Sequence, residues 1–311
     1  MADYVFGIDV GGTSIKCGLF KTDGTIVDKW EIKTRTENNG DEIIPDVAKS
    51  VQQKMKEKGI QKEDVAGLGM GVPGPVTANS EVLVAVNLHW GHKKVAAELE
   101  ALLGFTVKVG NDANVAALGE MWKGGGRGTQ NLIMVTLGTG VGGGIIVDGK
   151  IVVGAHGAGG EIGHAAMEPD LEASCNCGNH GCLEQFASAT GIVRLAKEEL
   201  ALAKEPTVLN PDTVSAKAVL DAYKTEDVVA VRIVEDFAKA LGNALAIFAC
   251  VVDPEIFVIG GGVSKAGQPL IDVIQKYYQQ YAFKSCKETA LVQAELGNDA
   301  GIYGAAKLAL E

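Results

Sequence analysis

The sequence predicts an α/β protein of two domains built on a duplicated strand meander. The first copy begins with two buried apolar strands, at 4–10 and 14–20, which the pair Gly11-Gly12 separates. A third strand follows the turn signal Asp23-Gly24. A second copy of this pattern starts at residue 132.

The second copy repeats the order of strands and turns. Apolar strands at 132–137 and 144–147 flank the turn Gly138-Thr139-Gly140, and Asp148-Gly149 is the next hairpin signal. Helical segments follow each copy. We therefore expect two α/β domains that face each other across a cleft, with a glycine-rich turn from each pointing into it.

The elements between the two copies complete the first domain. Helical patterns span 41–58 and 93–103, and apolar strands span 65–70 and 107–109. Because a new helix begins after the strand at 107–109, we place the domain crossover near residue 112. The expected domains are 1–112 and 113–297, with the segment 298–311 packing back on the first domain and Gly124-Gly125-Gly126 acting as a flexible joint.

The second half of the chain alternates helix and strand. A long helix over 227–250 is closed by Asp253-Pro254, and the strand at 255–259 leads into Gly260-Gly261-Gly262. The last helix is expected over 300–310. The polar stretch 204–212 predicts a surface loop.

Composition narrows the class of protein. A chain of 311 residues exceeds the usual limit of one core, and 47% hydrophobic with 22% charged residues is typical of globular domains. The formal charge of −11 disfavours nucleic acid and anionic membranes as partners. No signal peptide is recognisable at the start, and the apolar stretch 245–252 is too short to span a bilayer. We expect a cytoplasmic protein.

Two glycine-rich turns are candidate anion sites. Asp9-Val10-Gly11-Gly12-Thr13 allows backbone amides to approach a phosphate, although a plain hairpin with positive φ is the alternative. From Gly138 to Gly144, five of seven residues are glycine, more than one hairpin requires. Contact with an anion explains this run better. It is neither a Walker loop, because no Lys-Ser or Lys-Thr follows, nor a dinucleotide fingerprint.

Asp112 is the candidate general base. It follows Asn111 at the crossover from strand to helix, where an aspartate often only caps the helix. At the floor of a cleft, opposite a phosphate-binding turn, its carboxylate could accept the proton of an attacking hydroxyl group. We expect the second role.

A cluster of thiols predicts a metal. Cys175, Cys177 and Cys182 lie within eight residues, and three thiolates leave one tetrahedral position for an imidazole. His164 is the expected fourth ligand, with His180 as the alternative; the cysteines could also be small buried residues. Four protein ligands make a structural zinc, which would shape the loop that ends in Glu184.

These motifs together resemble the ROK family, named for repressors, open reading frames and kinases, and especially its bacterial glucokinases. The resemblance rests on Asp-Val-Gly-Gly-Thr at 9–13, Leu-Gly-Thr-Gly at 137–140, Gly-Gly-Glu-Ile-Gly-His at 159–164 and the cysteine knuckle at 175–182. It spans nearly the whole chain. It implies the actin-like ATPase, or ribonuclease H-like, version of the two-domain fold.

The resemblance also implies roles for individual residues. The implied sugar contacts are Asn87, Asn111, Asp112, Glu161, His164 and Glu184, with Asp112 as base. The implied contacts to the phosphates of ATP are Gly11, Gly12, Thr13, Gly138, Thr139 and Gly140. Gly260, Gly261 and Gly262 would border the adenosine. Asp9 would lie near a magnesium ion and its waters.

The sequence thus predicts an ATP-dependent kinase that transfers a phosphoryl group to the 6-hydroxyl of glucose. Kinases for N-acetylglucosamine, N-acetylmannosamine, mannose or fructose resemble the chain in the same motifs, and polyphosphate is an alternative donor. The rival classes are a non-catalytic sugar-binding protein and a repressor; a repressor would carry a helix-turn-helix domain before Asp9, for which we expect no room. Family resemblance and the prevalence of two-fold oligomers favour a homodimer.

Overall fold

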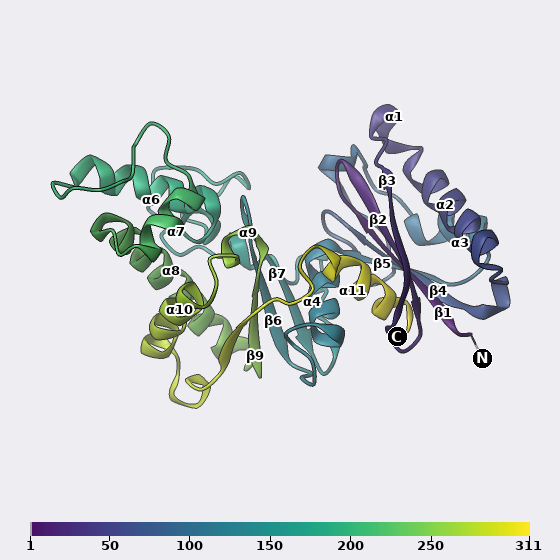
Figure 1. Cartoon of the computed structure of the whole chain (residues 1–311). Coiled ribbons are helices and arrows are strands. Elements are labelled where there is room, and N and C mark those ends of the chain that lie inside the picture. Colours follow the sequence, from purple (N-terminus) through teal and green to yellow (C-terminus); the bar gives the residue numbers. More distant parts are fainter. Residues whose placement is uncertain (1) are drawn as a thin grey trace. The chain divides into compact units, whose positions relative to one another are not determined.

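Two five-stranded sheets with the same strand order form the framework of the computed structural model, which describes residues 2–311 (Figure 1). The first sheet has the order β3-β2-β1-β4-β5, with β1 (Tyr4–Val10), β2 (Ser14–Lys21), β3 (Ile26–Lys33), β4 (Val65–Val72) and β5 (Val107–Asn111). The second has the order β8-β7-β6-β9-β10, with β6 (Leu132–Leu137), β7 (Val141–Val147), β8 (Lys150–Ile151), β9 (Ile256–Gly260) and β10 (Ala290–Gln293). Counted from the start of each copy, both orders are 3-2-1-4-5, which confirms the predicted duplication.

Strand directions agree with that repeat. In the first sheet β1 pairs antiparallel with β2 and parallel with β4, and β4 pairs parallel with β5. In the second, β6 and β10 pair parallel with β9, and β7 pairs antiparallel with β8. The turn between β7 and β8 has Asp148 at φ 51° and Gly149 at φ 73°. Two successive left-handed residues are what the Asp-Gly hairpin signal predicts.

Eleven α-helices are assigned among the described residues. They are α1 (Glu37–Gly40), α2 (Ile43–Lys58), α3 (Val95–Leu103), α4 (Asp112–Lys123), α5 (Glu184–Ala187), α6 (Ala189–Leu202), α7 (Ala216–Lys224), α8 (Val228–Val252), α9 (Gly261–Ser264), α10 (Gln268–Tyr281) and α11 (Ala300–Ala309). The long helix α8 ends at Asp253, whose φ of 50° reverses the chain before Pro254. Between α6 and α7 the chain has neither helix nor strand, as the polar composition of 204–212 predicts.

The chain divides into two compact units. The first contains the residues up to Gln130 together with 144–160 and 295–311, and the second contains 131–143 and 161–294. Helix α4 therefore belongs to the first unit, whereas the sequence analysis assigned it to the second domain. The reason is packing, because α4 lies against α11 and β4, both in the first unit.

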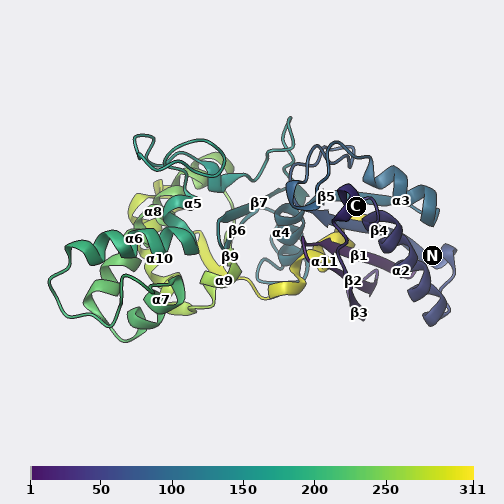
Figure 2. The ribbon, with the colours of Figure 1, turned by 90° about the horizontal axis from the view of Figure 1, so that it is seen from above.

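Alternation along β1 builds the core of the first unit. Phe6, Ile8 and Val10 join the apolar cluster that includes residues of α2 and α3. Val5, on the opposite side of the strand, packs with Ile302 of α11. The sheet is thus covered on both faces, by α2 and α3 on one side and by α4 and α11 on the other (Figures 1 and 2).

Helix α11 lies on this sheet at backbone contact distance. A Cβ added to Gly69 of β4 would lie 1.7 Å from the carbonyl oxygen of Ala305, and one on Gly7 of β1 would lie 2.0 Å from that of Ile302. The contact with α4 is similar, because a Cβ on Gly304 would lie 1.7 Å from the carbonyl oxygen of Val115. Only glycine permits these approaches.

The glycine stretch after α4 is held in place, in contrast to the flexible joint expected from the sequence. Its anchor is Glu120, a fully buried residue of α4. The Glu120 carboxylate accepts hydrogen bonds from the backbone amides of Gly125 (2.8 Å), Glu295 (3.0 Å) and Leu296 (2.9 Å). These bonds tie the end of α4 to the segment that leads into α11.

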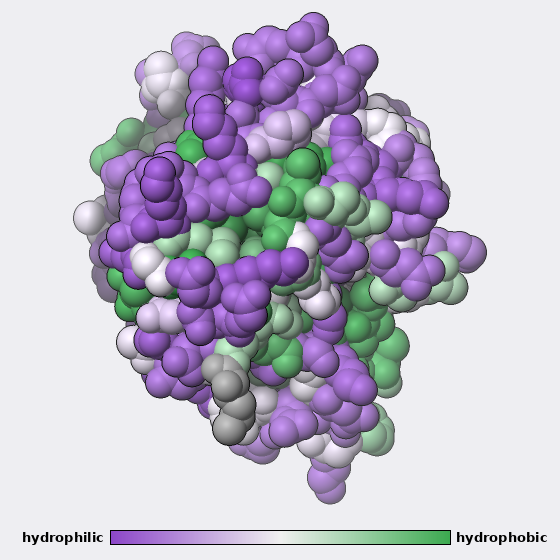
Figure 3. Space-filling view, turned by 90° about the vertical axis from the view of Figure 1, so that its right-hand side faces the viewer, coloured by the Kyte–Doolittle hydropathy of each residue, from purple (hydrophilic) through white to green (hydrophobic). Residues whose placement is uncertain are grey.

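In the second unit, helices α6, α7, α8 and α10 pack against one another in a layer beside the strands (Figures 1 and 2). No helix of residues 2–311, including the 25-residue α8, is long and apolar enough to cross a membrane. Figure 3 shows one face of the first unit, where hydrophilic residues surround a smaller central area of apolar ones.

The contact between α4 and α11 gives a test of the packing. Gly304→Ala should force the two helices apart and lower the free energy of unfolding by about 1–3 kcal/mol. Gly91→Ala is the control, because a Cβ there has nothing within 4 Å and Gly91 has no positive φ. Urea unfolding of both variants measures the effect, and equal stability of the two would contradict the close contact.

Candidate active site

The turn between β1 and β2 is a tight hairpin whose residues are exposed. The amide of Gly11 donates to the carbonyl oxygen of Ser14 over 3.0 Å, and Gly11, Gly12 and Thr13 are exposed. Neither glycine has a positive φ, so backbone strain does not explain them. A Cβ on Gly12 would lie 3.8 Å from Cβ of Asn87, which places this candidate sugar contact beside the turn.

Asp9 lies two residues before this turn and is held under α11. A Cβ on Gly301 of α11 would lie 2.6 Å from Oδ2 of Asp9, so glycine at this position makes room for the carboxylate. Burial raises the pKa of Asp9, and the charge of Lys16, its partner across the strand pair, opposes that shift. A nearby cation would favour the charged form of a carboxylate in this setting.

The cap of helix α4 is Asn111 and not Asp112. The Asn111 side chain is the helix cap, with Oδ1 accepting from the amides of Ala113 (3.0 Å) and Asn114 (3.1 Å). Its Nδ2 donates to the carbonyl oxygen of Gly74 over 3.1 Å. The Asp112 carboxylate accepts from Ala113 over 2.8 Å but is not the cap. Capping therefore does not account for an aspartate at 112.

The glycine turn of the second unit is fixed by the start of α6. The amide of Ala189 donates to the carbonyl oxygen of Gly138 (2.8 Å), and the Thr190 hydroxyl donates to that of Thr139 (2.7 Å). A Cβ on Gly140 would lie 2.4 Å from Oε2 of Glu184. The turn and this candidate sugar contact are therefore neighbours.

The rest of the glycine run has another role. Gly142, Gly143 and Gly144 lie within β7 and not in the turn, which corrects the expectation that all five glycines serve an anion. A Cβ on Gly144 would lie 2.5 Å from Cβ of Ala117 in α4, so helix packing accounts for that glycine.

The third glycine run adjoins the turn at 138–140. Gly260 ends β9, and Gly261, at φ 85°, begins α9. A Cβ on Gly261 would lie 2.5 Å from the carbonyl oxygen of Leu137, directly before Gly138, whereas one on Gly262 would meet nothing within 4 Å. The second unit thus brings together both glycine runs that the sequence assigned to the nucleotide.

Three sulfurs and one imidazole gather in the loop before α5. The ligand atoms of His164, Cys175, Cys177 and Cys182 all lie within 4.8 Å of one another. The structure brings His164 and not His180 to the sulfurs; Nδ1 of His180 lies 2.9 Å from the carbonyl oxygen of Leu171 instead. A compact Cys₃His set fits a tetrahedral zinc ion.

The thiols in this loop are in different environments. Burial raises the pKa of Cys175 to about 12 and also raises the pKa of Cys182. The backbone amide of Asn179 holds the pKa of Cys177 below its usual value. A divalent cation is what normally keeps such buried thiols deprotonated.

His164 connects the cysteines to two carboxylates. Its Nδ1 lies 3.7 Å from Sγ of Cys175 and 3.9 Å from Oε1 of Glu184. On the other side of the ring, Nε2 lies 3.9 Å from Oε2 of Glu161. The second unit therefore places Glu161, His164 and Glu184 together, with Nδ1 toward the sulfurs and Nε2 toward Glu161.

A cavity of about 430 Å³ adjoins this group, with Thr139, Gly140, Cys175, Glu184, Thr190 and Arg194 among its lining residues. Two residues of the site were not singled out from the sequence. Thr190 helps to fix the turn at 138–140, and Gly301 makes room for the Asp9 carboxylate. For Gly301 a signal existed, because glycines within a short helix indicate close packing.

Comparison with known proteins identifies the family. Residues 5–311 match the model of the ROK family. The chain is 43% identical to the glucokinase of Halalkalibacterium halodurans over 96% of its own length and 92% of that protein. It is 36% identical to the glucokinase of Streptomyces coelicolor, covering 98% of this chain and 97% of the other. The chain belongs to the ROK family.

A solved structure gives the same result. The ROK family glucokinase from Streptomyces griseus, in complex with glucose and AMPPNP, is 34% identical, covers 98% of both chains and superposes with a TM-score of 0.75. The predicted actin-like fold is thereby confirmed.

The cap at Asn111 can be tested by itself. Asn111→Ala removes the acceptor for two amides and should lower the free energy of unfolding by about 1–2 kcal/mol. Asn111→Ser, which keeps an acceptor at the cap and, like alanine, lacks the donor to Gly74, should lose less. Urea unfolding distinguishes the two, and an alanine variant as stable as the serine variant would contradict the capping role.

Proposed function

We propose that this protein transfers the γ-phosphoryl group of ATP to the 6-hydroxyl of glucose. The observation that carries the proposal is the 43% identity to a glucokinase over nearly the full chain, together with the likeness to a glucokinase that binds glucose and AMPPNP. The glycine turns and the carboxylates described above supply the groups that such a transfer needs.

The donor side of the proposal uses backbone amides. The turn at 11–13 is exposed, and in the turn at 138–140 Thr139 is exposed. Because the amides of Gly11 and Gly138 donate within their turns, the N–H groups that follow them are the ones proposed to reach phosphate oxygens. The run at 260–262 would border the adenosine. Magnesium would neutralise phosphate charge near Asp9, whose half-buried carboxylate is suited to a cation and its waters.

The acceptor side uses side chains that suit sugar hydroxyls, since each hydroxyl can both donate and accept a hydrogen bond. Asn87, Asn111 and Asp112 of the first unit, with Glu161, His164 and Glu184 of the second, are the proposed sugar ligands. Carboxylates and amides of this kind discriminate between epimers, because a misplaced hydroxyl leaves a buried polar group unpaired. Asp112 is the proposed base, and Asn111, as the cap of α4, holds the backbone beside it.

Zinc is proposed as a structural ion on His164, Cys175, Cys177 and Cys182. With four protein ligands it has no open position and would not activate water. It would orient the His164 ring through Nδ1 and leave Nε2, beside Glu161, free to bond a sugar hydroxyl. A homodimer and a cytoplasmic location stay predictions.

The test of the function is direct. The purified protein is incubated with ATP, magnesium and a panel of hexoses at equal concentration, and ADP is measured; polyphosphate then replaces ATP. Glucose should give the highest kcat/KM. Absence of turnover with every hexose would exclude a kinase, and a strong preference for another hexose would replace glucose as the acceptor.

Asp112→Asn tests the base. The amide keeps the shape of the side chain but cannot take a proton, so kcat should fall by roughly two to four orders of magnitude with little change in glucose affinity. Turnover and glucose binding are measured on the same preparation. Near-normal turnover would show that another group is the base.

Cys177→Ala tests the coupling of metal and sugar. The variant should lose zinc and raise KM for glucose much more than KM for ATP, because the loop that orients His164 and Glu184 loosens. Cys286→Ala, a buried thiol outside the cluster, is the matched control and should keep its zinc. Zinc content and steady-state kinetics decide; unchanged glucose affinity in a zinc-free variant contradicts the coupling.

His164→Ala and His180→Ala extend that test to the fourth ligand. The first variant should lose zinc and the second should retain it, since only His164 lies with the sulfurs. Tight zinc retention after His164→Ala would exclude His164 as a ligand.

A further inference from the structure

A buried threonine supports the turn at 11–13. Thr34 directly follows β3, and 4% of its surface is exposed. Its hydroxyl donates to the carbonyl oxygen of Gly11 over 2.7 Å, and its backbone amide donates to that of Thr13 over 3.0 Å. The first and last residues of the turn are thus bonded to one residue. The proposed reaction assigns no role to the Thr34 hydroxyl.

The hydroxyl bond sets the direction of a neighbouring amide. In a planar trans peptide, the carbonyl oxygen of Gly11 and the amide hydrogen of Gly12 point in opposite directions. A peptide unit between two glycines rotates easily, because neither residue has a Cβ to restrict it. The bond to Thr34 selects one orientation and directs the Gly12 N–H away from Thr34. Within residues 2–311 that N–H has no hydrogen-bond acceptor, and it is one of those proposed to reach a phosphate oxygen.

The segment that begins at Thr34 continues to a second part of the proposed site. Its later residues contact the loop at 86–90, which carries one of the proposed sugar ligands. Nε1 of Trp90 donates to the carbonyl oxygen of Gly40 over 3.1 Å, and Nδ1 of His89 lies 3.1 Å from the carbonyl oxygen of Thr36. The segment 34–40 therefore bonds both to the turn at 11–13 and to this loop.

Gly40 lies close to the backbone beside the sugar ligand Asn87. Asn38, Asn39 and Gly40 have φ of 51°, 59° and 64°, a left-handed run that asparagine and glycine tolerate best. A Cβ on Gly40 would lie 2.5 Å from the carbonyl oxygen of Leu88, the residue after Asn87. Only glycine permits this approach.

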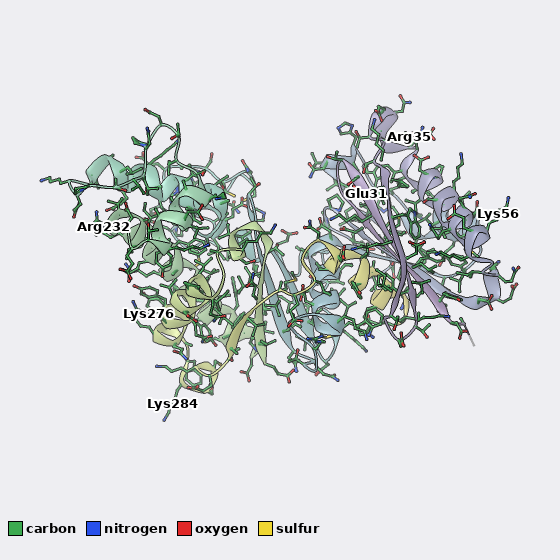
Figure 4. The ribbon with its side chains drawn as sticks, in the orientation of Figure 1. Glu31, Arg35, Lys56, Arg232, Lys276 and Lys284 are labelled. Atoms are coloured by element: carbon green, nitrogen blue, oxygen red, sulfur yellow. The ribbon has the colours of Figure 1, made fainter. Side chains whose placement is uncertain are left out.

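Between these contacts the segment is anchored to α2. The guanidinium of Arg35, which is labelled in Figure 4, donates to the two carboxylate oxygens of Asp46 over 2.7 and 2.6 Å. A bidentate pair of this kind fixes geometry as well as adding attraction. The segment is therefore held on its outer side while its inner side contacts the turn and the loop.

We propose that Thr34 is a positioning residue for phosphoryl transfer, and that the segment 34–40 holds the turn at 11–13 and the loop of Asn87 in fixed relation within the first unit. The proposal rests on the proposed function, because it takes this turn and Asn87 as contacts of phosphate and sugar. Thr34 acts through the peptide between Gly11 and Gly12. Gly40 acts through the backbone of the loop.

The Thr34 hydroxyl is tested by nucleotide binding. Thr34→Val removes the hydroxyl at nearly the same shape, and binding of AMPPNP with magnesium, measured by calorimetry on the full-length protein, should weaken about three- to tenfold. Thr34→Ser keeps the hydroxyl and should bind nearly as well as the unchanged protein. Glucose affinity should stay the same in both. Thr106→Val, at an exposed threonine before β5, is the control for the same chemical change.

Two outcomes overturn the role of Thr34. One is unchanged nucleotide affinity in Thr34→Val, and the other is an equal loss in Thr34→Ser, which would show that the hydroxyl is not the cause. Steady-state kinetics separate positioning from simple loss of folded protein. Positioning raises KM for ATP and leaves KM for glucose unchanged, whereas a smaller folded fraction lowers only the apparent kcat.

The contact of the segment with the loop is tested by glucose binding. Gly40→Ala should weaken it about three- to tenfold, because Leu88 must move and Asn87 moves with it, and should leave AMPPNP affinity unchanged. Gly59→Ala is the matched control. Its φ of 67° imposes the same backbone penalty, but a Cβ there has nothing within 4 Å, so glucose affinity should not change.

His89→Gly is a milder variant in case Gly40→Ala does not fold. His89 is exposed and has φ 58°, so glycine keeps the backbone and removes the bond to Thr36. Glucose binding should again weaken while AMPPNP binding stays the same. Unchanged glucose affinity in the folded variants overturns the role of the segment.

Failure of the proposed function gives a different result. Turnover of glucose by the unchanged protein, with ligand affinities that do not respond to these variants, overturns only this inference. Affinities that follow the expected pattern, without turnover of any hexose, overturn only the proposed function. Absence of binding of both AMPPNP and glucose to the unchanged protein overturns both.

Discussion

The backbone contact of α11 with β1, β4 and α4 is the constraint on which the first unit depends. At Gly7, Gly69 and Gly304 a single methyl group would meet backbone at 2.0 Å or less. The same helix leaves space at Gly301 for the Asp9 carboxylate. The position of the proposed magnesium-binding carboxylate is therefore set by the packing that closes the core, and Glu120 fixes the segment that leads into α11.

Different contacts hold the glycine turns of the two duplicated sheets. In the first unit, the hairpin at Gly11 is closed by its own backbone bond to Ser14. In the second, the start of α6 holds the turn, and Glu184 packs against Gly140. Among the described residues, only the second unit carries the cysteine loop, so the surroundings of the two turns differ. This asymmetry fits a protein in which one copy adds substrate contacts to a shared nucleotide-binding plan.

Strand periodicity and turn signals predicted the strands of the two meanders and the long helix α8 closely, because these depend on local pattern. The sequence analysis did not single out β10, α6 or α7. The sequence already favoured His164 over His180 as the fourth ligand, although His180 is nearer along the chain, and the folded loop brings His164 to the sulfurs. The sequence also did not predict to which unit α4 belongs. Its partners, α11 and β4, lie far along the chain in opposite directions, and no local pattern reports such packing.

The first unit is made from both ends of the chain, and this has a consequence for biosynthesis. On a ribosome, β1 to β5 emerge well before residues 295–311, which complete the unit. Until then this face of the sheet has α4 but lacks α11, and Val5 and Phe20 lack the contacts of Ile302 and Ala306. The second unit, which is contiguous apart from one strand segment, can fold in the meantime. The nascent chain thus carries an incomplete first unit until residues 295–311 have been made.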